Sequence, residues 1–191
     1  MHEWQLRRQQ EAETEDDAHA PSSLREILEM APEANKTPIP VICCGKTEQI
    51  GRGVIEGLKP EYEVIHFITT PASGAAIIPA ILAGQTPPPT HADSSAIGSG
   101  NYAAAPRAII LGSAFDDDAL ATIKKGVADA AAKAGGPEMR KVPWVRNDTS
   151  KPAPPIGPEY GRAVVARCKE ALGRLEKEGK LDGGYDGDEW Y

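Results

Sequence analysis

The sequence lacks the features that mark several large classes of protein. Its three cysteines, two of them adjacent, form neither a disulfide framework nor a spaced set of metal ligands, so we expect no metal. The net charge is −7 and no basic stripe is present, which argues against nucleic acid as a partner. Because so few cysteines suit a reducing compartment, we expect a cytoplasmic protein.

Long hydrophobic runs are missing too. The longest, GAAIIPAILAG at 74–84, is about half as long as a membrane span and contains a proline. No apolar run follows the first charged residues, so they do not have the pattern of a secretory signal. We therefore expect a soluble protein without a membrane partner.

Two polar ends flank the part of the chain that has the composition of a folded domain. Residues 1–37 are a flexible, charged extension in which a capping-box sequence predicts a short helix at 22–31. Residues 180–191 are an acidic tail, which we also expect to be flexible. The chain between them, 38–179, is long enough for a single domain.

Within this domain, apolar strand patterns alternate with helix patterns. The predicted strands are 40–44, 62–68, 107–112 and 141–148. The predicted helices run through 50–58, 73–84, 116–136 and 159–178. The alternation predicts a three-layer α/β fold with a four-stranded, mainly parallel, Rossmann-like sheet. In such a sheet, ligands bind at the carboxyl ends of the strands.

One loop at a strand end, CGKTEQIG at 44–51, has the residues of a phosphate-binding turn. GKT is the end of a P-loop, but Pro40 stands where that motif needs its first glycine, so the amide cradle is missing. The position after a strand and before a helix suits a dinucleotide-binding turn better. It would also suit an anion site for another small molecule, and the glycines could simply let the helix pack closely on the sheet.

Gly45 and Gly51 match the first and last glycines of a G-x-x-x-G-x-G turn, with Gln49 in the middle position. Over this βαβ unit of about 30 residues, the chain resembles the Rossmann-type NAD(P)-binding proteins, in particular the short-chain dehydrogenase and NmrA-like group. The Tyr-x-x-x-Lys pair of the short-chain dehydrogenases is absent. The resemblance implies a nicotinamide cofactor, and NADP fits better than NAD because Thr69 and Thr70 stand where NAD binders carry an acidic residue. The cofactor would contact Gly45, Lys46, Thr47, Gly51, Arg52, Thr69, Gly112 and Ser113.

Candidate residues for chemistry belong to the same predicted rim. Lys46 and Arg52 could hold the additional phosphate of NADP. His66 is the core histidine whose pKa suits proton transfer, and a stiff proline-rich connection holds Tyr160 near the rim. We take His66 and Tyr160 as candidate catalytic residues, although a strand histidine is often purely structural. Cys44 is either a thiolate at the start of a helix or a small buried apolar residue.

The fourth predicted strand ends in a polar cluster of Trp144, Arg146 and Asp148. Their alternate positions place all three on one face. Arg146 could grip a carboxylate or phosphate while Trp144 stacks on a ring, which makes the three candidate substrate-binding residues. The alternative is an ion pair between Arg146 and Asp148. The long segment at 85–106, rich in proline and serine, would cover the site.

Together these features predict a small soluble protein that binds a phosphate-bearing ligand, with NADP as the leading candidate, at the strand ends. As a reductase it would act on a small organic molecule, and the cofactor would supply the hydride chemistry. One alternative is a cofactor-free lyase or isomerase of a small carboxylate that uses His66 and Arg146. Another is a ligand-sensing or adaptor protein whose helix at 22–31 contacts a protein partner or a second copy in a homodimer.

Overall fold

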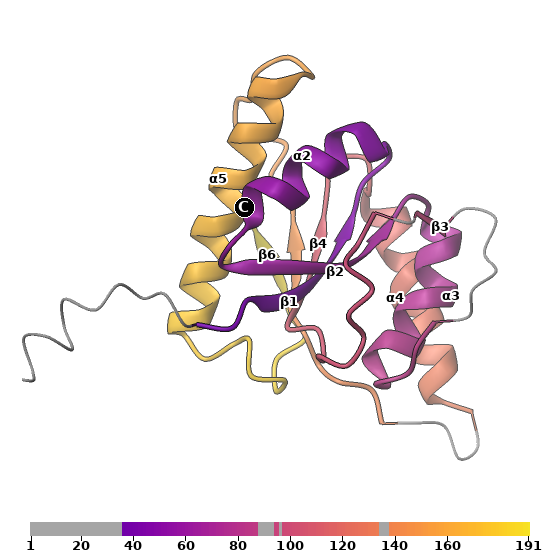
Figure 1. Ribbon diagram of the computed structural model, residues 1–191. Coiled ribbons are helices and arrows are strands. Elements are labelled where there is room, and N and C mark those ends of the chain that lie inside the picture. Colours follow the sequence, from indigo (N-terminus) through magenta and orange to yellow (C-terminus); the bar gives the residue numbers. More distant parts are fainter. Residues whose placement is uncertain (1–35, 88–93, 96, 134–137) are drawn as a thin grey trace, which may run out of the picture. The chain divides into compact units, whose positions relative to one another are not determined.

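A central sheet of six strands has the order β3-β2-β1-β4-β5-β6 (Figure 1). The strands are β1 (Ile39–Cys44), β2 (Tyr62–Ile68), β3 (Ser94–Ser95), β4 (Ala108–Leu111), β5 (Trp144–Arg146) and β6 (Asp188–Trp190). All neighbours are parallel except the short β3, which is antiparallel to β2. The fold is that of a computed structural model, which describes residues 36–87, 94–95, 97–133 and 138–191. The predicted helix at 22–31 lies outside these residues.

The described helices are α2 (Glu48–Leu58), α3 (Pro71–Leu82), α4 (Asp117–Ala131) and α5 (Pro158–Lys177). Local sequence explains where two of them begin. Thr70 accepts a hydrogen bond from the amide of Ser73, whose hydroxyl accepts one from the amide of Thr70, so α3 starts in a capping box. Asp116 caps α4 by accepting from the amide of Ala119. α2 differs, because the side chain of Thr47 before it makes no capping hydrogen bond.

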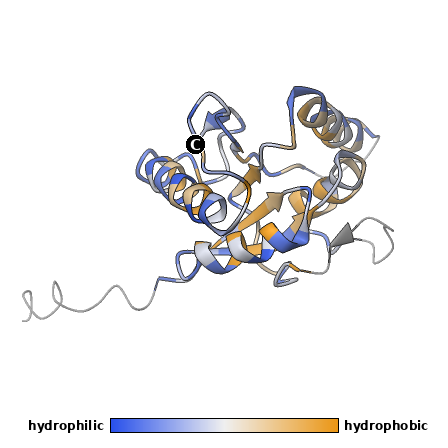
Figure 2. Cartoon of the chain, turned by 90° about the horizontal axis from the view of Figure 1, so that it is seen from above, coloured by the Kyte–Doolittle hydropathy of each residue, from blue (hydrophilic) through white to orange (hydrophobic). Residues whose placement is uncertain are grey.

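Apolar side chains fill both faces of the sheet. α2 and α5 pack together over one face, and α3 and α4 over the other. Figure 2 shows the hydrophobic residues concentrated on the strands. Val41, Ile42 and Ile109 on the central strands β1 and β4 are fully enclosed, as expected of continuous apolar runs. The predicted α/β class and parallel sheet are confirmed, but the prediction of four strands is wrong because it misses β3 and β6.

One crossover differs from the others in hand. The steps from β1 to β2 and from β4 to β5 run in opposite directions across the sheet, and their helices α2 and α4 lie on opposite faces. These two crossovers therefore share a hand, which the general rule for parallel strands makes right-handed. The step from β5 to β6 runs in the same direction as that from β4 to β5, yet α5 lies on the face of α2. The α5 crossover therefore has the rare left hand.

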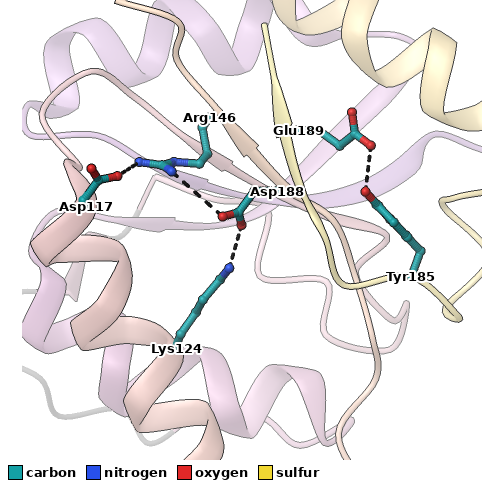
Figure 3. A network of polar contacts seen from close by, with 6 residues as sticks. All are labelled: Asp117, Lys124, Arg146, Tyr185, Asp188 and Glu189. Atoms are coloured by element: carbon teal, nitrogen blue, oxygen red, sulfur yellow. Dashed lines mark hydrogen bonds and ion pairs between the residues drawn. The ribbon is translucent and has the colours of Figure 1, made fainter.

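The carboxyl-terminal residues form an edge of the sheet. β6 pairs with β5, and Tyr191 after it is only 2% exposed and donates its hydroxyl hydrogen bond to the carbonyl of Leu111. The carboxylate of Glu189 accepts a hydrogen bond from Tyr185 (Figure 3). The prediction of a flexible tail at 180–191 is therefore wrong, because this segment has partners in the sheet and in the core.

Where it is described, the segment predicted to cover the site runs along the sheet edge instead. β3 pairs with the outer side of β2. The amides of Ser99 and Gly100 then donate to the carbonyls of Val64 and Ile65. These residues extend the sheet beside β2, at the far side from β4. No helix in the described part of the chain is long and apolar enough to cross a membrane.

Candidate functional site

A cavity of about 240 Å³ lies at the carboxyl ends of β1 and β4. At these two neighbouring strands the strand order reverses, because β1 leads outward to β2 while β4 leads outward to β5. In open α/β sheets, ligands bind in the crevice at such a switch point. Apolar side chains form most of its walls, and they come from β2, β4, α2, α5 and the segment just before α5. Those side chains are Ile50, Val54, Phe67, Ile110, Ile156 and Val164.

Six of the eight predicted cofactor-binding residues line this cavity, namely Gly45, Lys46, Thr47, Gly51, Gly112 and Ser113. Lys46 and Thr47 are exposed, and they lead directly into the first turn of α2. The positive end of a helix dipole and its first amides attract anions. This side of the cavity therefore has the charge and position for an anionic group.

The two glycines of the turn are explained by packing. A Cβ atom at Gly51 would lie 2.5 Å from the ring of Phe67, and one at Gly45 would lie 3.0 Å from it. The amide of Gly45 donates to the carbonyl of Ile68 and so belongs to the sheet. The glycines therefore make room for a side chain of the protein itself. This finding favours the packing explanation of the turn over close approach to a pyrophosphate.

A pair of hydroxyl groups lies on the β4 and α5 side of the cavity. Ser113 Oγ, just after β4, is 2.9 Å from the hydroxyl of Tyr160 in the first turn of α5. Both residues line the cavity, and so does Tyr191. The cavity thus combines one cationic edge, one hydroxyl pair and apolar walls. Sequence patterns gave no signal for Tyr191, which follows an acidic stretch.

A comparison with known proteins finds kojic acid related protein 6 of Aspergillus oryzae (strain ATCC 42149 / RIB 40). The two chains are 40% identical over 148 residues, which is 75% of this chain and 82% of the relative. The chain belongs to the kojic acid related protein 6 family. No family model matches the chain. No solved structure matches it.

In this member of the kojic acid related protein 6 family, His66 lies apart from the cavity. Its Nδ1 atom is 2.7 Å from the hydroxyl of Tyr102, and its side chain is not among those that line the cavity. Burial lowers the pKa of His66, so the ring is held neutral. Its Nε2 atom is buried and has no hydrogen-bond partner among the described residues. The predicted catalytic residues His66 and Tyr160 are therefore not brought together, because Tyr160 lines the cavity and His66 does not.

Arg146, from the predicted substrate-binding cluster, lies at the β6 edge (Figure 3). Arg146 forms ion pairs with Asp117 and, at 3.9 Å, with Asp188 of β6. Its guanidinium also stacks on the ring of Trp190, 4.3 Å from the centroid. The alternative ion pair between Arg146 and Asp148 is not observed among the described contacts, and the predicted grip of Arg146 on a ligand stays a prediction. Arg146 instead connects β5, β6 and the start of α4.

Trp144 and Asp148 are also engaged away from the cavity. The ring of Trp144 is buried on the α3 and α4 face, and the ammonium group of Lys124 lies 5.4 Å from its centroid. Asp148 accepts hydrogen bonds from the amide and hydroxyl of Ser150, which lowers the pKa of its carboxyl. None of the three cluster residues lines the cavity.

Of four further predicted positions, Arg52, Thr70 and Cys44 have partners or packing within the protein. Arg52 pairs with Glu48 at 3.2 Å on the exposed side of α2, and neither Arg52 nor Thr69 lines the cavity. Thr70 is engaged in the cap of α3. Cys44 lines the cavity but is buried, and desolvation raises its pKa strongly, so it is a thiol and not a thiolate. The packing interpretation of Cys44 therefore fits its environment.

Proposed function

We propose that this protein binds a small phosphate-bearing organic molecule in the cavity between the ends of β1 and β4. The phosphate would lie against Lys46 and the first turn of α2, and the organic part would contact the apolar walls. The observation that supports this proposal is the position of the cavity at the switch point of the sheet, with Lys46 and Thr47 among its lining residues.

Charge also supports an anionic ligand at this place. Among the described residues, Lys46 has no ion-pair partner, whereas Arg52 on α2 is paired with Glu48. Lys46 therefore brings a positive charge to the edge of the cavity. A phosphate ester would supply the charge that the protein does not.

The size and shape of the cavity favour a ligand with one phosphate group. Its volume of about 240 Å³ is small for a ligand pocket; such pockets usually span roughly 300–1,000 Å³. Phe67 occupies the notch between Gly45 and Gly51, where a pyrophosphate would approach the backbone. Arg52 does not line the cavity and so lends no support to the additional phosphate of NADP. We therefore favour a mononucleotide or a smaller phosphate ester over NADP.

The proposal concerns binding and assigns no reaction. A reductase would need NADP or another redox cofactor in this crevice, and a lyase would need an acid–base group and an anchor near the ligand. His66 and Arg146, the candidates for the lyase, are held by Tyr102 and by the β6 edge. The hydroxyl pair of Ser113 and Tyr160 would donate to or accept from an oxygen of the organic part.

Binding of phosphate compounds tests the proposal. Inorganic phosphate, AMP, FMN and NADPH would be titrated by calorimetry, together with kojic acid, which the name of the relative suggests as a phosphate-free ring. A hydrogen bond to a charged group contributes about 1.5–3 kcal/mol, so Lys46→Ala should weaken phosphate binding roughly tenfold to a hundredfold.

Arg52→Ala is the matched control, since it removes a neighbouring cation that does not line the cavity. This variant should bind as the unaltered protein does, and binding should weaken with added salt. Binding that depends on Arg52 and not on Lys46, binding of kojic acid alone, or no binding of any phosphate compound would each refute the proposal.

A further inference from the structure

A second hollow adjoins the cavity and runs between α2 and α5. Its volume is about 720 Å³, and it shares Thr47, Ile50 and Ile156 with the cavity at the strand ends. The two spaces therefore meet at these side chains. We call the second space the α2–α5 groove, defined by Ile50, Gly53 and Gly57 on one side and Ile156, Gly161 and Val165 on the other.

The groove has apolar walls that the protein leaves partly uncovered. Ile156, where the cavity and the groove meet, is 82% exposed. Ile50 and Val165 are only half-buried, although each has a large apolar side chain. An exposed isoleucine beside half-covered apolar neighbours forms a surface that gains from contact with a further apolar group.

Two glycines in the groove have no packing reason to be glycine. A Cβ atom at Gly53 or Gly161 would meet nothing within 4 Å, whereas one at Gly57 would lie 2.8 Å from Val165. Gly57 therefore lets the two helices approach each other. Glycine within a helix is less favourable than alanine, and no neighbour demands it at Gly53 or Gly161. Because Gly53 and Gly161 have no side chains, the groove stays open at these two positions.

We propose that the α2–α5 groove binds a single apolar chain of the same ligand whose phosphate lies at Lys46. The ligand class is then a phosphate monoester that carries one alkyl or isoprenoid chain. Along α2, the stretch from Thr47 to Gly57 rises by about 15 Å, which is enough for a chain of medium length. This inference rests on the proposed phosphate site and extends it into the groove.

Alkyl phosphates of increasing length test the inference. Ethyl, hexyl and decyl phosphate would be titrated by calorimetry below the concentrations at which they form micelles. Each buried methylene adds about 0.8 kcal/mol, or roughly a fourfold gain in affinity, so hexyl phosphate should bind more than tenfold tighter than ethyl phosphate.

Leucine at the two open glycine positions should fill the groove. Gly53→Leu and Gly161→Leu should remove the gain with chain length while ethyl phosphate still binds. Gly173→Leu is the matched control, because Gly173 is also on α5 with open space around it but lies outside the groove. Circular dichroism and thermal melting show that each variant is folded.

The outcomes separate this inference from the phosphate site. Lys46-dependent binding of ethyl phosphate without any gain from a longer chain overturns the groove inference and leaves the phosphate site intact. A gain with chain length that Gly53→Leu and Gly161→Leu abolish, but that does not depend on Lys46, overturns the phosphate site and leaves the groove. If the leucine variants change the sedimentation of the protein but not chain binding, the groove belongs to a second copy and the inference fails.

Discussion

Replacing Tyr191 by alanine tests whether the carboxyl-terminal strand belongs to the core. The ring of Tyr191 is 2% exposed and packs in the apolar cluster beneath α2 and α5. Truncation of a buried large aromatic side chain typically costs about 3–5 kcal/mol, as transferred apolar surface plus the cavity left behind. We expect Tyr191→Ala to lower the free energy of unfolding by this amount.

Two related substitutions separate the ring from its surroundings. Tyr191→Phe removes the hydroxyl that donates to the carbonyl of Leu111, and this carbonyl still accepts from the amide of Asn147 at 3.2 Å. Its cost should be about 0.5–1.5 kcal/mol, because no buried acceptor is left without a partner. Trp190→Ala changes the neighbouring residue, whose ring is 47% exposed and stacked on Arg146. An exposed contact of this kind contributes about 0.5–1 kcal/mol.

Urea unfolding followed by circular dichroism measures all three variants on one scale. In a chain of this size, each kcal/mol of destabilisation lowers Tm by about 2–4 °C, so Tyr191→Ala should melt about 10 °C below the unaltered protein. If Tyr191→Ala costs no more than Trp190→Ala, the last strand is peripheral. The expectation of a flexible acidic tail would then be right, and the left-handed crossover through α5 would not stabilise the fold.

Three further substitutions address α2 and β2. Gly51→Ala should destabilise the protein by about 1–3 kcal/mol, because the added methyl group overlaps with Phe67. Gly53→Ala should stabilise it by up to about 1 kcal/mol, because alanine favours the helix and meets no neighbour. Urea midpoints that shift in the same direction for both variants would contradict the packing argument. Burial lowers the pKa of His66 in the folded protein. As the pH falls, the unfolded chain therefore binds this proton first, and the free energy of unfolding should decrease below about pH 6.5. This range lies well above pH 4, where carboxylates titrate. The urea midpoint measured as a function of pH tests this, because His66→Asn should reduce the decrease in stability below about pH 6.5. If His66→Asn leaves that decrease unchanged, another titratable group causes it.

Local patterns in the sequence were sufficient for the central strands and for the position of the cavity at their ends. PVICC predicted β1 because a strand buried on both faces must be apolar at every position. Parallel strands all open their carboxyl ends at one edge, so the loop after β1 was also the right place to look for a cavity. Both inferences need only residues that are close together in the chain.

The β6 edge could not be predicted, because its stabilising partners are far away in the sequence. Asp188 pairs with Lys124 at 2.6 Å and also with Arg146 (Figure 3). Glu189 accepts from Lys180 at 2.8 Å. An acidic stretch read by itself is typical of a solvated tail. The cations that make it an edge strand come from α4, β5 and the residues after α5. The left-handed crossover adds to the difficulty, since the usual rule of hand argues against it.

Side-chain periodicity identified which residues share a face but not what covers that face. Trp144 and Arg146 do lie on one side of β5, yet that side meets α4 and β6 and not the cavity. The glycines have the same ambiguity, since their spacing cannot distinguish space taken by the protein from space left open. The ring of Phe67 packs against Gly51, whereas no atom lies close to the position that a Cβ of Gly53 would take, although both glycines are on α2. Open space at a glycine does not by itself indicate a ligand, because Gly173 on α5 has it too. Gly53 differs because it lines the α2–α5 groove, so the proposal of a ligand chain rests on the walls of that groove and not on the glycine turn.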